Sequence, residues 1–294
     1  MGTVYAVAGG KGGIGKSVIS ILFGRACSLS GKQTVLVDAD LGGANLHTLL
    51  GMIYPSRSLV DFLMKRNCSL EDTLLTTKDK NIRMISGTGE ILGAANLQAT
   101  VKNKLIRHIK GLDADCIILD LGSGSSFNVL DFFIAADRHL LVVSTEPTSL
   151  QNVYEFLKLC VERILHKSFY KEEPMKKYIS RFIFPNEDDG ISTISELLEL
   201  VGKKSGKMSE EIAASIAAFQ PHLVVNMAED QAEAKKYFSA VEKTAWRYLK
   251  TKVTFVTAIL RTNDIQKTIK RRQSLLTMKM GSNYSQVMKI KAFI

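Results

Sequence analysis

The stretch Gly9-Gly10-Lys11-Gly12-Gly13-Ile14-Gly15-Lys16-Ser17 decides how the rest of the chain is interpreted. It fits the phosphate-loop pattern G-x-x-x-x-G-K-[ST] at every fixed position. The short apolar run 3–8 before it predicts a β-strand, and the apolar spacing over 18–26 after it predicts an α-helix. Backbone N–H groups between a strand and a helix start can surround a polyphosphate. The stretch therefore predicts a nucleotide site.

Two side chains of this loop have expected roles. Lys16 would reach the β- and γ-phosphates, and the Ser17 hydroxyl would hold Mg²⁺. Glycines are needed because side chains would fill the space that phosphates occupy. The alternative is a glycine-rich turn that matches by chance, but the complete pattern and its context favour the nucleotide site.

A second lysine, Lys11, stands near the start of the loop, where an ordinary phosphate loop does not require one. It is either a solvated loop lysine or a second cation for the nucleotide, delivered to a neighbouring subunit. Its spacing alone leaves both interpretations open.

Carboxylates follow two predicted strands. The strand 34–38 ends in Asp38-Ala39-Asp40, and the strand 116–120 ends in Asp120, as in a Walker-B strand. Ligands of α/β sheets bind at the carboxyl ends of the strands, so we expect these groups to serve Mg²⁺ and the attacking water. Gly124, just beyond, could sense the γ-phosphate through its backbone N–H. A turn that uses Asp and Asn for local hydrogen bonds is the alternative around Asp38.

Further strands are predicted at 82–86, 139–144, 223–226 and 253–259, with helices between them. Residues 166–190 are polar and helices follow, so 166–220 is interpreted as a helical insertion. The result is one α/β domain over 1–294, with a mostly parallel sheet of about seven or eight strands. A last helix, about 282–293, covers the sheet or serves as a weak membrane anchor.

Composition narrows the class of protein. The chain has 294 residues, 46% hydrophobic and 23% charged, which suits one large α/β domain. No apolar run approaches the ~20 residues of a membrane span, and we expect no signal peptide. The four cysteines form no C-x-x-C pair, so free thiols in the cytosol are expected rather than a disulfide or metal site: Cys27, Cys68, Cys116 and Cys160.

The net charge of +10 is concentrated near the end of the chain. Residues 241–294 hold twelve Lys or Arg and only Glu242 and Asp264 as acids, while the rest of the chain is balanced. Such a region attracts nucleic acid, anionic lipid or an acidic partner, or it is simply a solvated basic face.

The run 10–17 resembles the deviant Walker A motif of the MinD/ParA class of dimerising P-loop ATPases. Residues 38–45 resemble the switch I of that class, and 120–124 resemble its switch II. Within the class, 38–51 and 119–133 look most like the FlhG (FleN) branch, which regulates flagellar number and placement. The resemblance implies a three-layer P-loop fold that binds ATP and Mg²⁺.

The resemblance also implies residue roles. Lys11 would cross the dimer interface to the partner's nucleotide, Asp40 would orient the attacking water, and Asn45 would help build the interface. Ser17 would bind Mg²⁺ directly, with Asp38 and Asp120 acting through water. The nucleotide contacts would come from Gly10, Lys11, Gly12, Gly13, Ile14, Gly15, Lys16, Ser17, Val18, Asn45, Gly124 and Asn226.

Asn226 is the residue that would contact adenine. The chain departs from the family pattern after Ile259, where Leu260-Arg261-Thr262 stands in place of the usual proline. This departure leaves the remaining adenine contacts open.

Three functions follow from these features. The first is a slow ATPase switch, dimeric when ATP-bound, that acts on a protein partner in the cytoplasm or at the inner face of the membrane. The second is a partition ATPase that binds non-specific DNA through the basic C-terminal part. The third, an iron–sulfur electron carrier of the nitrogenase Fe-protein type, lacks support because Cys116 lies inside a strand and no suitable second cysteine follows.

Overall fold

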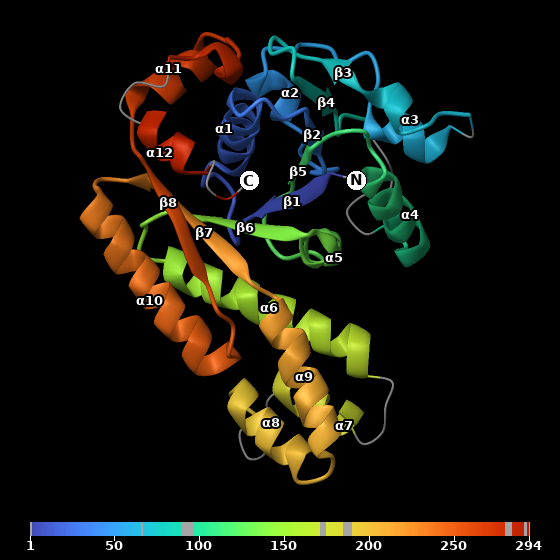
Figure 1. The fold of residues 1–294 in the computed structure, drawn as a ribbon, viewed down its shortest axis with the longest axis vertical. Coiled ribbons are helices and arrows are strands. Elements are labelled where there is room, and N and C mark those ends of the chain that lie inside the picture. The colour runs from blue at the N-terminus through green and yellow to red at the C-terminus, as the bar shows by residue number, and fades with distance from the viewer. Residues whose placement is uncertain are drawn as a thin grey trace.

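A central β-sheet with helices on both faces organises the molecule (Figure 1). The computed structural model describes residues 2–65, 67–89, 97–170, 175–184, 190–279, 284–290 and 293. The sheet has eight strands in the order β3-β4-β2-β5-β1-β6-β7-β8. These are β1 (Thr3–Ala8), β2 (Thr34–Asp38), β3 (Leu75–Thr76), β4 (Ile82–Ile85), β5 (Cys116–Asp120), β6 (Arg138–Val143), β7 (Pro221–Ala228) and β8 (Thr254–Leu260).

All strand pairs are parallel except β3–β4, which is antiparallel. The central strands β2 and β5 are buried at every position, which explains their continuous apolar sequences. The predicted fold class is confirmed. The sequence analysis missed β3, whose two residues are too short to show a strand period.

The helices form two layers. They are α1 (Lys16–Leu29), α2 (Leu46–Leu49), α3 (Leu59–Met64), α4 (Ala99–Lys110), α5 (Phe127–Ala135), α6 (Ser149–Phe169), α7 (Met175–Ile183), α8 (Ile194–Gly202), α9 (Gly206–Ala218), α10 (Gln231–Leu249), α11 (Asn263–Lys270) and α12 (Tyr284–Ile290). Two 3₁₀ segments are η1 (Glu71–Thr73) and η3 (Leu275–Thr277).

Alternate residues of β1 separate the two cores. Val4 and Ala6 face the core shared with α4, α5, α6 and α10, whereas Tyr5 and Val7 face the core shared with α1, η3 and α12. This alternation is the two-residue period of a strand buried on both faces. It produces a three-layer arrangement with α1 and α12 above the sheet and α5, α6 and α10 below it in Figure 1.

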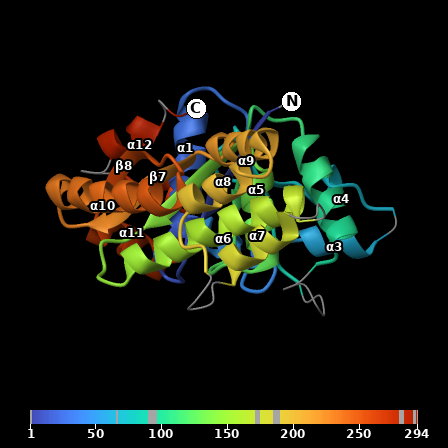
Figure 2. The same ribbon diagram turned by 90° about the horizontal axis from the view of Figure 1, so that it is seen from below.

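Helices α7, α8 and α9 gather at one end of α6, and α10 and α4 lie on opposite sides of α6 (Figure 2). Helix α6 extends to Phe169, into the part of the chain (166–220) that the sequence analysis interpreted as an insertion. Helix α7 was not predicted, because many charged residues surround it. It buries Met175, Ile179 and Phe182, which follow helical spacing.

The last described helix, α12, packs on β8 and α1. Val287 and Ile290 are fully buried there, so their apolar surface covers the sheet and is not presented to a membrane. Residues 282–283 and 291–292 of the predicted helix lie outside the described part of the chain. Within that part, no helix combines the length and hydropathy of a membrane span, and all four cysteines are free thiols.

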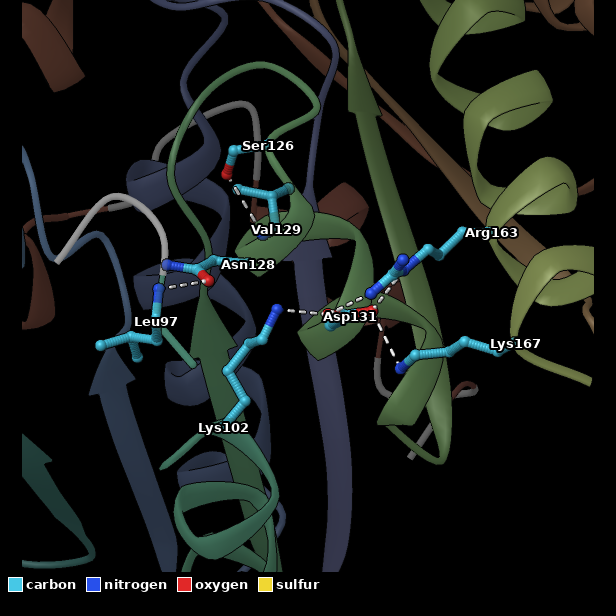
Figure 3. A network of polar contacts seen from close by, with 8 residues as sticks. All are labelled: Leu97, Lys102, Ser126, Asn128, Val129, Asp131, Arg163 and Lys167. Atoms are coloured by element: carbon cyan, nitrogen blue, oxygen red, sulfur yellow. Dashed lines mark hydrogen bonds and ion pairs between the residues drawn. The ribbon is translucent and has the colours of Figure 1, made fainter. Parts of the chain in front are cut away.

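One buried carboxylate joins three helices (Figure 3). Asp131 of α5 accepts hydrogen bonds from Lys102 of α4 and from Arg163 of α6, the latter at 2.8 and 3.0 Å. The ammonium of Lys167, also on α6, lies 2.9 Å from the same carboxylate. We call these four residues the Asp131 cluster. It fixes α5, which directly follows the 121–126 loop, against both of its neighbours.

Candidate nucleotide-binding site

The phosphate loop, residues 9–15, connects β1 to α1 at the carboxyl end of the sheet. Gly15 has φ 86° and is the N-cap of α1, and a Cβ there would lie 2.3 Å from the Asn226 Nδ2 atom. A Cβ on Gly10 would lie 2.6 Å from the Asn152 carbonyl oxygen. Both positions therefore require glycine, Gly15 for its left-handed backbone and both for close approach. Gly12 and Gly13 are exposed at the tip.

Lys16 opens α1 and points back to the loop. Its Nζ atom donates to the Lys11 carbonyl oxygen at 3.5 Å, and its side chain is largely buried. Burial lowers the pKa of Lys16, while the charges of Asp120 and Asp40 act to raise it. An ammonium held at the loop and near carboxylates is suited to phosphate oxygens and a metal-bound nucleotide.

Asp38 and Asp120 lie side by side at the ends of β2 and β5. Both are buried. Asp38 accepts hydrogen bonds from the Leu46 backbone N–H at 3.0 Å and from the Asp40 N–H at 3.3 Å. Burial and the charge of Asp120 raise the pKa of Asp38 to about 8. These two carboxylates strongly disfavour being ionised together without a cation.

Asp120 also contacts the start of α1. Its Oδ1 atom accepts a hydrogen bond from the Ser20 hydroxyl at 2.9 Å. Burial raises the pKa of Asp120 to about 6, and hydrogen bonds from Ser17 and Ser20 oppose that rise. The sequence analysis missed Ser20, although its position one turn after Lys16 places it on the same face of the helix.

The donor set fits Mg²⁺. The residues that could hold it are Ser17, Asp38 and Asp120, with water and nucleotide oxygens completing the shell. In the described ranges, no group of three or more His, Cys, Asp or Glu side chains could hold a metal.

Asp40 lies between two loops. Its Oδ1 atom is 3.0 Å from the place of a Cβ on Gly122, and its Oδ2 atom is 3.3 Å from that of a Cβ on Gly43. The 39–45 and 121–126 loops thus meet around one partly buried carboxylate. Gly124 has φ 79°, with no heavy atom within 4 Å of a Cβ there, so its backbone is open.

Lys11 and Asn45 are both exposed. The Lys11 Nζ atom lies 3.2 Å from Oε2 of Glu146, a residue that the sequence analysis did not single out. The Asn45 Nδ2 atom donates to the Gly43 carbonyl oxygen at 2.6 Å, within its own loop. Neither side chain is committed to the core, so both remain accessible to a second molecule.

Asn226 is buried at the end of β7, and its Nδ2 atom donates to the Ile14 carbonyl oxygen at 2.8 Å. The side chain therefore supports the phosphate loop directly. It also borders a pocket of about 160 Å³ between the ends of β7 and β8 and the start of α11. The pocket is lined by Val18, Asn226, Met227, Leu260, Arg261, Thr262, Ile265 and Gln266.

This pocket lies beside the phosphate loop, because Asn226 lines it and also donates a hydrogen bond to the Ile14 carbonyl oxygen of the loop. Of the residues that line the pocket, the sequence analysis named Asn226 and Val18 as nucleotide contacts. It did not single out Met227, Ile265 or Gln266. The sequence analysis did note Leu260-Arg261-Thr262, where the family resemblance leads one to expect a proline, and all three residues line the pocket.

A profile of the family described as CobQ/CobB/MinD/ParA nucleotide binding domain matches residues 5–275. The chain belongs to this family. The match begins in β1 and ends in η3, so it includes the phosphate loop, Asp38, Asp120 and the residues that line the pocket beside Asn226. This family membership agrees with the resemblance of the loop and switch sequences.

Two curated relatives are similar in sequence to about half of this chain. The antiactivator FleN of Pseudomonas aeruginosa is 35% identical over 158 residues, 53% of this chain and 55% of FleN. The septum site-determining protein MinD of Helicobacter pylori is 30% identical over 155 residues, 52% of this chain and 56% of that MinD. The chain thus spans little more than half the length of these relatives.

Solved structures share its fold over nearly the whole length. MinD of Pyrococcus horikoshii, in complex with Mg-ADP, has a TM-score of 0.65 at 17% identity and covers 99% of this chain and 95% of its own. The cell division ATPase MinD of Pyrococcus furiosus has a TM-score of 0.66 at 18% identity, with 99% and 98% covered. At these identities the likeness establishes the MinD/ParA fold of this family member.

Proposed function

We propose that this chain is a slow, Mg²⁺-dependent ATPase that dimerises when it binds ATP. The observation that carries the proposal is the placement of the buried Lys16 ammonium near the buried carboxylate of Asp120, which is itself paired across neighbouring strands with the buried Asp38, at an open glycine loop. A nucleoside triphosphate with its cation would neutralise all three groups at once.

In this proposal each side chain has its own role. Lys16 neutralises charge on the phosphates, and Ser17, Asp38 and Asp120 hold Mg²⁺, which supplies charge neutralisation at the transferring phosphate. Asp40 orients the attacking water from its place between the two loops. No strong base is needed, because phosphoryl transfer depends chiefly on positioning and electrostatic stabilisation.

Two variants test the ATPase. Lys16→Ala should reduce ATP-dependent phosphate release by about a hundredfold or more and weaken nucleotide binding, because a buried cation at the phosphates is lost. Asp40→Ala should reduce phosphate release while nucleotide still binds. Release is measured with Mg²⁺ and again with EDTA, and equal release in the two conditions would contradict the metal site.

The dimer would be bridged by two nucleotides, with Lys11 of each subunit reaching the phosphates of the other. The exposure of Lys11, Gly12, Gly13 and Asn45 supports this interface. Sedimentation velocity with a non-hydrolysable ATP analogue should show a dimer that ADP does not produce. Unchanged ATP-dependent dimerisation of Lys11→Ala would refute the crossing lysine.

We further propose a role in regulating flagellar number or placement, supported by the identity with FleN and by the switch sequences. The partner would be a protein of the flagellar system. Deleting the gene in its host and counting flagella per cell by electron microscopy tests this role. Cells with unchanged number and placement of flagella would contradict it.

The second candidate function is a partition-type ATPase that binds DNA without sequence specificity. A pocket lined by basic side chains favours it. A pocket of about 450 Å³ between α11 and η3 is lined by Lys267, Arg271 and Lys279, with Asp264 as its one acidic member. Such a site suits phosphates.

Joint substitution of Arg271 and Arg272 by Glu should abolish binding to duplex DNA, because repulsion then replaces attraction to the phosphates. Binding is measured by fluorescence anisotropy across a salt series. Vesicles of anionic lipid serve as the comparison surface for the same basic region. Absence of DNA binding by the ATP-bound wild type at low salt would remove this candidate.

A further inference from the structure

One serine interrupts the buried apolar residues of α1. Ser20 is fully buried, and its neighbours Ile19, Ile21 and Leu22 are buried apolar residues. A buried hydroxyl needs a hydrogen-bond partner, whereas an apolar side chain at the same position would need none. The partner of Ser20 therefore indicates why a polar residue stands there.

The Ser20 hydroxyl has one proton and two acceptors within reach. Asp120 Oδ1 is 2.9 Å away, and the Lys16 carbonyl oxygen is 3.1 Å away. The Lys16 carbonyl belongs to the preceding helical turn, and many helical serines form such a contact without any further role. An ionised carboxylate is the stronger acceptor, so the proton goes to Asp120.

Asp120 depends on neighbouring side chains for its orientation. The pairing of β5 with β1 and β2 places its backbone. The last side-chain torsion of an aspartate is soft, so the backbone does not fix the direction of the carboxylate oxygens. Ser17 and Ser20 both donate to this carboxylate from one face of α1. In the proposed site Ser17 also holds Mg²⁺, so Ser20 is the donor that is not shared with the cation.

We propose that Ser20 is a positioning residue that holds the Asp120 carboxylate in the orientation that serves Mg²⁺. This role rests on the proposed Mg²⁺-dependent nucleotide site and adds to it a side chain outside the phosphate-loop pattern. Hydrogen-bond partners of metal ligands direct those ligands, and their loss typically lowers metal affinity by about ten- to a hundredfold. A serine that only satisfied the Lys16 carbonyl would contribute to stability and leave the Mg²⁺ requirement unchanged.

The test is Ser20→Ala, which removes the hydroxyl. Binding of a fluorescent ADP is measured in EDTA and over a series of free Mg²⁺ concentrations. The free Mg²⁺ concentration that gives half of the enhancement in binding should rise roughly ten- to a hundredfold. The affinity in EDTA should equal that of the wild type, which also shows that the variant is folded. An unchanged Mg²⁺ requirement would overturn the proposal.

Ser28→Ala is the matched control. Ser28 is another buried serine of α1, and its hydroxyl donates to the Asp79 carboxylate at 2.8 Å. Asp79 precedes β4 and so lies at the amino end of that strand, away from the nucleotide site. The Mg²⁺ requirement of Ser28→Ala should therefore equal that of the wild type. A rise as large as that in Ser20→Ala would assign the effect to the loss of any buried hydrogen bond of α1 and contradict the positioning role.

A double-mutant cycle with Asp120→Ala tests whether Ser20 acts through this carboxylate. Asp120→Ala alone should raise the Mg²⁺ requirement, because a carboxylate that serves the cation is lost. Adding Ser20→Ala should then change nothing further. A second rise, equal to the one that Ser20→Ala causes in the wild type, would show that Ser20 acts independently of Asp120 and would overturn the proposal.

The proposed metal site and the role of Ser20 fail in different ways. Wild-type protein that binds the fluorescent ADP equally well in Mg²⁺ and in EDTA would refute the metal site, and the role of Ser20 with it. A wild type that depends on Mg²⁺, together with a Ser20→Ala variant of the same Mg²⁺ requirement, would refute the role of Ser20 alone.

Discussion

At Gly15 the backbone conformation and the neighbouring side chain act together. The residue has φ 86°, and a Cβ would lie 2.3 Å from the Asn226 amide nitrogen that supports the loop at Ile14. A single methyl group would therefore strain the backbone and displace Asn226 from the loop. At the residue scale, this one contact connects the phosphate loop with the pocket that Asn226 lines.

Gly15→Ala should accordingly lose nucleotide binding as well as stability. Gly31→Ala is the matched control, since Gly31 has φ 78° but no atom within 4 Å of a Cβ. Its free energy of unfolding should fall by only about 1 kcal/mol, because alanine strains the backbone at a positive φ. Urea unfolding measures the stability of each variant, and titration with a fluorescent ATP analogue measures its nucleotide affinity. Normal nucleotide affinity in Gly15→Ala would contradict the close contact.

At the scale of elements, the Asp131 cluster fixes α5 between α4 and α6 (Figure 3). Burial acts to raise the pKa of Asp131, but hydrogen bonds from Arg163, Lys102 and Lys167 hold it well below its usual range. Since α5 begins just after the 121–126 loop, the cluster gives that loop a rigid end.

Asp131→Asn should destabilise the fold by about 3 kcal/mol, because it leaves Lys102 buried beside other cations without a carboxylate. Glu199→Gln is the control, since its pair with Lys203 lies on an exposed helix surface and should contribute nothing measurable. Urea unfolding of both variants provides the comparison. Equal stability of Asp131→Asn and wild type would show that the cluster does not stabilise this junction.

At the scale of the whole molecule, buried titratable groups on the sheet make stability depend on pH in opposing directions. At the amino ends of β6 and β7, burial lowers the pKa of His139, and burial with the charge of Arg138 lowers that of His222 to about 4. At the carboxyl ends, the pKa values of Asp38 and Asp120 are raised. Stability from the histidines is lost as pH falls, whereas the two carboxyl groups respond in the opposite sense.

The histidine contribution is measured as a difference between proteins. Unfolded histidine has a pKa of about 6.5, so the unfolded chain takes up the proton of His222 first as pH falls towards 4. Relative to wild type, His222→Gln should therefore gain about 1–2 kcal/mol between about pH 7.5 and pH 5. Urea unfolding of both proteins at each pH measures this gain. A pH-independent difference would contradict the lowered pKa.

Much of the fold and site was predictable because the signals are local. The loop glycines, Lys16 and Ser17 lie within one short stretch, and Asp38 and Asp120 each directly end an apolar strand sequence, so neighbours in sequence identify them. The sequences of β2 and β5 predict strands because both strands are buried on both faces and are therefore continuous apolar runs. Strand β3 has only two residues, too few to show the alternation of a strand. The charged residues around α7 obscured the helical spacing of its apolar side chains.

The sequence by itself determined the P-loop fold class, the phosphate loop and the carboxylates expected to serve Mg²⁺, because each depends on short-range pattern. Only the tertiary structure placed Glu146 on Lys11, Asn226 on the loop backbone and Arg261 in a pocket beside α11. Glu146 and Lys11 are 135 positions apart, Asn226 and Ile14 are 212 apart, and Arg261 shares its pocket with the distant Val18. Their contact depends on how parallel strands align their carboxyl ends at one edge of the sheet, which no local pattern specifies.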